Sequence, residues 1–158
     1  MIDLILTLKV IHVFGAVVLF GTGLGIAFFM WMAHRTRDAA LIAGTARIVV
    51  IADVLFTATA AVAQPLSGVA LAGAIGYSLS ESWIVASIAL YVLVGLCWLP
   101  VLWIQIQLRD IAAYAARHGA KLPAGYFSLF RVWFALGWPA FAAMLAILAI
   151  MTWKPELW

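Results

Sequence analysis

The sequence predicts an all-α membrane protein, an antiparallel bundle of four transmembrane helices that residues 1–158 form as a single domain. Two observations lead to this prediction. Hydrophobic residues make up 68% of the 158 residues and charged residues only 9%, a composition outside the range of soluble domains. The apolar residues also fall into four long runs, each of which exceeds the length of about 20 residues that a bilayer-spanning helix needs.

The four runs follow one another with short connections. The first extends from about residue 4 to residue 32, and the second from about 45 to 74. The third covers residues 83–108, and the fourth about 127–153. Short connections place successive helices antiparallel, and no soluble catalytic domain is expected beside them. The protein is therefore expected to act in or at the lipid bilayer.

The basic residues predict the orientation of the bundle. Of the 9 Lys and Arg residues, all except Lys9 and Lys154 flank the first or the third connection: Arg35, Arg37, Arg47, Arg109, Arg117, Lys121 and Arg131. By the positive-inside rule these two connections face the cytoplasm, so both termini face outward across a bacterial inner membrane. The same side chains suit contacts with lipid headgroups, and nucleic-acid binding is not expected.

Lys9 and His12 lie inside the first apolar run, three residues apart and therefore on one helical face. Ionisable side chains in hydrocarbon are costly, so the pair indicates a buried partner or ligand. At a rise of about 1.5 Å per residue, His12 lies in the outer half of the membrane. Gln64, Tyr91 and Met144 of the other three runs reach a similar depth, which makes them candidate neighbours of a ligand held by His12.

A neutral imidazole that coordinates iron explains a His at this depth, because haem b is commonly held between the helices of a four-helix bundle. His34 lies about 33 Å further along the same helix, at about 1.5 Å per residue, so it cannot share an iron with His12. The opposite axial position is open to Met144, to Lys9 or to a residue of another subunit, or it stays unfilled. Lys9 is better placed to meet a haem propionate.

Under this interpretation the protein is a haem-dependent membrane oxidoreductase or electron-transfer protein, with a quinone or a partner oxidoreductase as its exchange partner. A homo-oligomer would supply a ligand from a second subunit. Two other interpretations stay open. In one, a noncatalytic membrane subunit or small transporter uses Lys9 and His12 as a proton or ligand site. In the other, the protein is a structural accessory whose His12 has its hydrogen bonds satisfied within the bundle.

Asp53 is the carboxylate that lies within the second apolar run, in the inner half of the membrane. Arg47 and Arg131 are the cations nearest to it in depth. Because an unpaired carboxylate in hydrocarbon is costly, we expect a salt bridge that ties the second helix to the fourth. A proton-relay role for these residues is the alternative.

Four segments and the Trp153-Lys154-Pro155 end resemble a bacterial family of predicted four-helix inner-membrane proteins of unknown function: KVIHVFGAVVLFGTGLG, ADVLFTATAAVAQPLSG, WLPVLWIQIQLRD and RVWFALGWPAF. The first segment is similar to the first helix of the copper-resistance D-like superfamily, which includes membrane-bound oxygen-independent protoporphyrinogen oxidases. Those oxidases carry a first-helix His implicated in haem ligation and a Lys on the third helix. The resemblance implies His12 as the haem ligand, whereas residues 83–108 contain no Lys.

Overall fold

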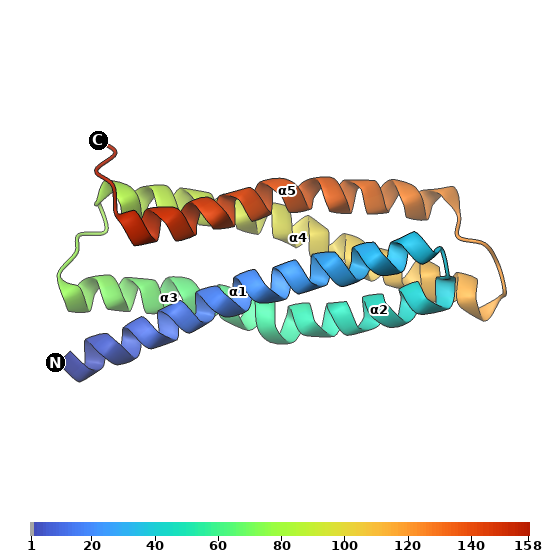
Figure 1. Ribbon diagram of the computed structural model, residues 1–158, viewed down its shortest axis with the longest axis horizontal. Coiled ribbons are helices and arrows are strands. Elements are labelled where there is room, and N and C mark those ends of the chain that lie inside the picture. Colours follow the sequence, from blue (N-terminus) through green and yellow to red (C-terminus); the bar gives the residue numbers. More distant parts are fainter. Residues whose placement is uncertain (1) are drawn as a thin grey trace.

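The computed structural model describes residues 2–158 and is entirely helical within them (Figure 1). Its helices are α1 (Ile2–Thr36), α2 (Ala39–Ala52), the π-helical turn η1 (Asp53–Thr57), α3 (Ala58–Ile75), α4 (Ser82–Arg117) and α5 (Ala124–Trp153). α2, η1 and α3 continue into one another and form the second span, Ala39–Ile75. The described residues thus contain 4 helices long and apolar enough to cross a membrane, and the predicted four-helix membrane bundle is confirmed.

Successive spans run antiparallel, so both chain termini lie at one end of the bundle, beside the connection 76–81 (Figure 1). We call this the terminal end. The connections 37–38 and 118–123 form the opposite, connection end. At the connection end Asp38 caps α2, because its Oδ1 atom accepts hydrogen bonds from the backbone N–H groups of Ala40 and Leu41 at 2.8 and 3.2 Å. At the terminal end Gly76 ends α3 with a φ of 95°, a left-handed conformation that favours glycine.

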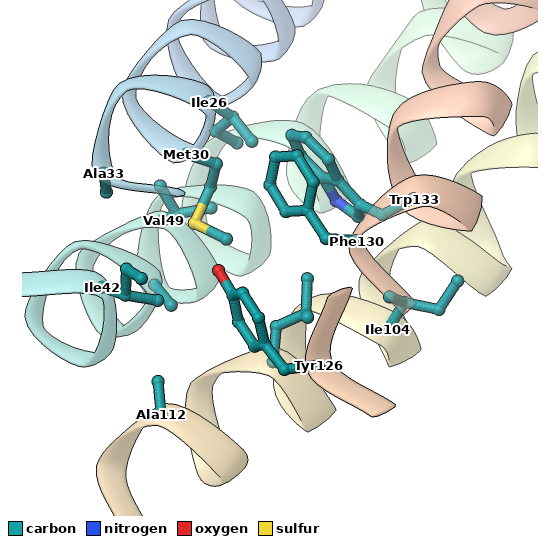
Figure 2. Close-up of a cluster of buried hydrophobic side chains, with 12 residues drawn as sticks. Ile26, Met30, Ala33, Ile42, Val49, Ile104, Ala112, Tyr126, Phe130 and Trp133 are labelled. Atoms are coloured by element: carbon teal, nitrogen blue, oxygen red, sulfur yellow. The ribbon is translucent and has the colours of Figure 1, made fainter. Parts of the chain in front are cut away.

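The spans pack unevenly along the bundle. α4 packs against α5 and α2, while α1 packs against α2 and α3. The main core lies toward the connection end, where Met30, Ile42, Leu108 and Tyr126 are fully buried (Figure 2). A smaller apolar cluster of Ala72, Trp83 and Ile84 closes the terminal end. Asp53, Gln64 and Ser67 of the second span lie between Val49 of the main core and Ala72 of the smaller cluster.

The outer surface of the bundle is apolar. Val10, Ile48 and Leu66 each expose more than 60% of their surface, at 68%, 70% and 67%. Exposed aliphatic side chains on every span suit contact with lipid tails, which are as apolar as the side chains themselves. The fold therefore buries polar groups inward and presents its large apolar side chains to the bilayer.

The helices extend beyond the apolar runs that the sequence predicts. α1 continues to Thr36, α4 continues from Leu108 to Arg117, and the second span begins at Ala39 rather than near residue 45. An apolar run marks the hydrocarbon layer, which is about 30 Å thick, but helical hydrogen bonds continue into the headgroup region where polar side chains are solvated. The turns added to α1 and α4 carry Arg35, Arg109, Asp110 and Arg117.

Candidate functional site

His12 is held by a serine from the second span. Its Nδ1 atom lies 3.0 Å from Ser67 Oγ, and Ser67 Oγ donates its own hydrogen to the carbonyl oxygen of Gln64 at 3.1 Å. Because a hydroxyl has a single hydrogen, Ser67 can only accept from His12 in this arrangement. This pairing assigns the imidazole proton to Nδ1 and leaves the lone pair on Nε2.

Two glycines allow α1 and α3 to approach each other closely around His12. A Cβ atom built on Gly68 would lie 3.0 Å from His12 Cε1, so the imidazole rests directly on the backbone of α3. A Cβ atom on Gly15 would overlap Oε1 of Gln64. Small residues at a helix contact of this kind permit close packing in membranes, and here they bring a ring and an amide against bare backbone.

Gln64 lies three residues before Ser67 and shares its helical face, and Tyr91 reaches the same helix from α4. Gln64 Oε1 is buried and has no hydrogen-bond partner among residues 2–158. The Tyr91 hydroxyl donates a hydrogen bond of 2.6 Å to the carbonyl oxygen of Ala61, about one helical turn from Gln64 toward the middle of the bundle. The depth predicted for Gln64 and Tyr91 thus corresponds to a shared region along α3.

Lys9 and Met144 form no hydrogen bond with His12 in the described part of the chain. Lys9 is exposed, and within the described part of the chain it forms neither a hydrogen bond nor an ion pair. Met144 is half-buried on α5, which packs chiefly on α4 and meets α1 through aromatic side chains, with Phe141 stacked on Phe20 and Phe130 on His34. A ligand set that includes Lys9 or Met144 beside His12 thus stays a prediction.

Asp53 forms the second polar centre of the bundle. It is 2% exposed and lies at the start of η1. Its Oδ1 atom accepts a hydrogen bond of 3.1 Å from Trp98 Nε1, and its Oδ2 atom accepts one of 2.8 Å from Gln105 Nε2. The other end of the Gln105 amide, Oε1, accepts from Trp133 Nε1 at 3.0 Å. These four side chains connect the second span, α4 and α5.

This network corrects the expected salt bridge between Asp53 and Arg47 or Arg131. Arg47 is exposed and lines a surface hollow near the connection end together with Arg109 and Asp110. Arg131 is also exposed, and it donates a hydrogen bond of 3.4 Å to Ser128 within its own helix. Both arginines leave the bundle interior because long cationic side chains reach more polar surroundings at the ends of a span.

Sequence reasoning missed Ser67, Trp98 and Trp133 as parts of these two centres. Ser67 could have been found, since it follows Gln64 by three residues and so shares its helical face. The roles of Trp98 and Trp133 carry no such signal, because an indole inside a span is indistinguishable by sequence from an ordinary apolar residue. The π-helical turn at Asp53 was not predicted either, although such turns are frequent at functional sites.

The three histidines lie apart from one another. His34 stacks on Phe130 near the connection end, with ring centroids 3.5 Å apart, and His118 is exposed just beyond α4. Within residues 2–158 no group of three or more His, Cys, Asp or Glu side chains could hold a metal ion.

Comparison with known proteins agrees with the fold. A family model described as predicted integral membrane protein (DUF2269) matches residues 6–155, which is nearly the whole chain. No match was found among curated proteins or among solved structures. The four apolar spans, the lipid-facing surface and the family match together establish an integral membrane protein. The chain belongs to the DUF2269 family of predicted integral membrane proteins.

Proposed function

We propose that this protein binds haem b through Nε2 of His12 and has a redox or electron-transfer role in the bacterial inner membrane. The observation that carries the proposal is the hydrogen bond between His12 Nδ1 and Ser67 Oγ. Metal-ligating histidines almost always donate their second ring N–H to a neighbouring group, which fixes the tautomer and orients the ring. Ser67, itself held by the Gln64 carbonyl, performs this orienting task here.

The packing around His12 holds its imidazole in one position, as an axial ligand requires. Gly68 places backbone rather than a side chain against the imidazole, and the neighbouring spans are separated into an α1–α3 pair and an α4–α5 pair. Neutral His ligation avoids the cost of a buried charge in the bilayer. Lys9, three residues away and exposed, is positioned to attract a propionate near the membrane surface.

The contacts between α1 and α5 guide the choice of a second axial ligand. Because the aromatic contacts of α5 with α1 in the described residues are made by Phe20 and His34 and none by His12, we propose that the sixth position is filled from a second copy of the chain or stays open, in preference to Met144. Haem would supply one-electron exchange, for which a membrane quinone or a partner oxidoreductase is the exchange partner. The similarity of the first helix to the copper-resistance D-like superfamily supports the same ligand.

An absorption spectrum of the purified protein tests the proposal. The wild-type protein is expected to show a Soret band, directly or after haem reconstitution, that His12→Ala removes while the helical circular dichroism persists. Ser67→Ala should weaken haem affinity by about 10–100-fold, the usual effect of removing a group that orients a metal ligand. The matched control is His118→Ala, which removes an exposed histidine and should leave the band unchanged.

Two outcomes would contradict haem binding at this site. One is a wild-type protein that stays colourless after reconstitution, and the other is a Soret band that survives His12→Ala. The first outcome would favour the alternative function, in which a noncatalytic membrane subunit or small transporter uses Lys9 and His12 as a proton or ligand site.

A further inference from the structure

A hollow at the connection end lies between one face of α2 and one face of α4, two helices that pack together. Residues three or four positions apart share a helix face, and this spacing relates the lining residues on each helix: Ala43, Gly44, Arg47, Arg109, Asp110 and Ala113. The volume of the hollow is about 400 Å³, within the range of about 300–1,000 Å³ found for small-molecule sites.

Small residues create the space in this hollow. Ala43, Gly44 and Ala113 carry no side chain larger than a methyl group, and a Cβ atom added to Gly44 would meet no neighbouring atom within 4 Å. The backbone groups of both helices are already used in helical hydrogen bonds. The polar partners that the hollow offers to a ligand are therefore its charged side chains.

The two arginines of the hollow have hydrogen-bond donors to spare. Arg47 is exposed and forms neither a hydrogen bond nor an ion pair with residues 2–158. Arg109 donates from Nε to Asp110 Oδ1 at 2.8 Å, which leaves its two terminal nitrogens for a ligand. Planar guanidinium groups match the oxygens of a phosphate in a bidentate manner, so the pair suits a phosphate.

Both arginines lie where the hydrocarbon layer ends. The second apolar run begins near residue 45 and the third ends at residue 108, so Arg47 and Arg109 are within about one helical turn of that border. The headgroup regions lie directly outside the hydrocarbon core, which is about 30 Å thick. The long arginine side chains extend toward this polar layer. The hollow is therefore at the depth of phospholipid phosphates.

Apolar side chains continue from the arginines toward the middle of the bundle. Ile51 follows Arg47 by four positions and is 49% exposed, and Ile106 precedes Arg109 by three positions and is half-buried. Each helix face thus carries a cation at the headgroup level and an aliphatic side chain within the hydrocarbon. A phospholipid has the same order of groups, with acyl chains below a phosphate, and this order favours a lipid over a free phosphate.

The charges of the hollow favour one class of headgroup. Arg47 and Arg109 contribute two positive charges and Asp110 one negative charge, a net charge of +1. Lys121, which lines an adjoining hollow together with Asp110, adds to the positive side. A phosphodiester with an uncharged headgroup balances this charge, whereas an ammonium group in the headgroup opposes it. Asp110 is 58% exposed, and its Oδ2 atom can accept a hydrogen bond from a headgroup hydroxyl.

We propose that the hollow between α2 and α4 binds one phosphatidylglycerol molecule. Arg47 and Arg109 hold its phosphate, Asp110 accepts a hydrogen bond from its glycerol headgroup, and its acyl chains lie along Ile51 and Ile106. Basic pockets between transmembrane helices bind anionic headgroups in this manner. The hollow lies at the connection end, whereas His12 is on the part of α1 nearer the terminal end. The proposal is independent of whether His12 binds haem.

Native mass spectrometry of the full chain in detergent tests the site. The protein is titrated with phosphatidylglycerol or with phosphatidylcholine of identical acyl chains. The wild-type protein should bind phosphatidylglycerol about tenfold more tightly, and Arg47→Gln and Arg109→Gln should each remove about that difference, because each deletes a hydrogen bond between charged groups. Equal affinity of the wild-type protein for the two lipids would overturn the proposal.

Arg131→Gln is the matched charge control. It removes one positive charge from the same end of the bundle, but Arg131 lies outside the hollow and donates to Ser128 of its own helix. The affinity for phosphatidylglycerol should stay unchanged. If Arg131→Gln weakens binding as much as Arg47→Gln does, the lipid responds to the overall charge and the proposed site is wrong.

Gly44→Leu tests the hollow without changing its charge. The new side chain enters open space and improves helix propensity, so helical circular dichroism and the unfolding midpoint should be preserved. Affinity for phosphatidylglycerol should fall about tenfold, because leucine occupies the volume of the headgroup. The control is Gly73→Leu, at an exposed glycine near the terminal end that also has no neighbour within 4 Å. Wild-type affinity in Gly44→Leu would overturn binding in this hollow.

Discussion

The hydroxyl of Tyr91 donates a hydrogen bond of 2.6 Å to the carbonyl oxygen of Ala61. In a regular helix that carbonyl accepts from the residue four positions later, which here is Pro65 and has no N–H. Tyr91 on α4 therefore satisfies the backbone group that Pro65 releases in α3. In hydrocarbon an unpaired backbone carbonyl is costly, and neighbouring helices commonly satisfy it. This bond also ties the α4–α5 pair to the α1–α3 pair.

Tyr91→Phe is expected to destabilise the bundle by about 1–3 kcal/mol, because it leaves the Ala61 carbonyl without a partner. The free energy of unfolding in mixed detergent micelles measures the effect. Tyr114→Phe is the control, since Tyr114 is 60% exposed and its hydroxyl forms no hydrogen bond with residues 2–158. Equal stability of the two variants would show that Tyr91 is not needed to satisfy Ala61.

Asp53→Asn should destabilise the protein by about 1–3 kcal/mol although it preserves shape. The new amide nitrogen must face either Trp98 or Gln105, and both donate at this site. Trp98→Phe removes one of the two donors that face this amide. The double variant Asp53→Asn/Trp98→Phe should therefore lose less unfolding free energy than the two single variants lose together. A double-mutant cycle on unfolding free energies measures this coupling.

The control for this cycle is Asp110→Asn at an exposed carboxylate, which should change stability by no more than about 0.5 kcal/mol. Strict additivity of Asp53→Asn and Trp98→Phe would contradict the donor-only environment of Asp53.

Gly68→Ala should disturb His12, because the added methyl group would lie 3.0 Å from His12 Cε1 and push the ring from Ser67. Overpacking of this kind costs about 1–3 kcal/mol. Gly73→Ala, in the same helix, meets no atom within 4 Å and should be neutral or stabilising by up to about 1 kcal/mol. The unfolding midpoint of Gly68→Ala should therefore be lower than that of Gly73→Ala. A lower midpoint for Gly73→Ala would refute the close contact at Gly68.

Reporter fusions should place both termini outside the bacterial inner membrane. The two connections of the connection end should be cytoplasmic, because the basic residues beside them, including Arg35 and Arg117, favour that side. Reporters inserted in the connections 37–38 and 118–123 show on which side of the membrane these connections lie. A cytoplasmic reporter signal from a fusion after Trp158 would invert the orientation.

The sequence by itself determined the four spans and their antiparallel order. Hydropathy along a continuous run is a local property, and in a bilayer such a run has to form a helix that satisfies its own backbone. Depth along each span also followed from the sequence, through the constant helical rise. For this reason Gln64 and His12 could be assigned to one level, and in the structure Ser67 links them.

Tertiary structure alone decided which side chains meet at each level. Arg47 and Asp53 lie close in depth, but at about 100° of rotation per residue they point to different sides of the second span. The π-helical turn at Asp53 changes that rotation further. The partners of Asp53 come from α4, which is distant in sequence, and depend on how all four helices pack. The depth of a residue follows from its position within one helix. The direction of its side chain and its partners depend on how the four helices pack together.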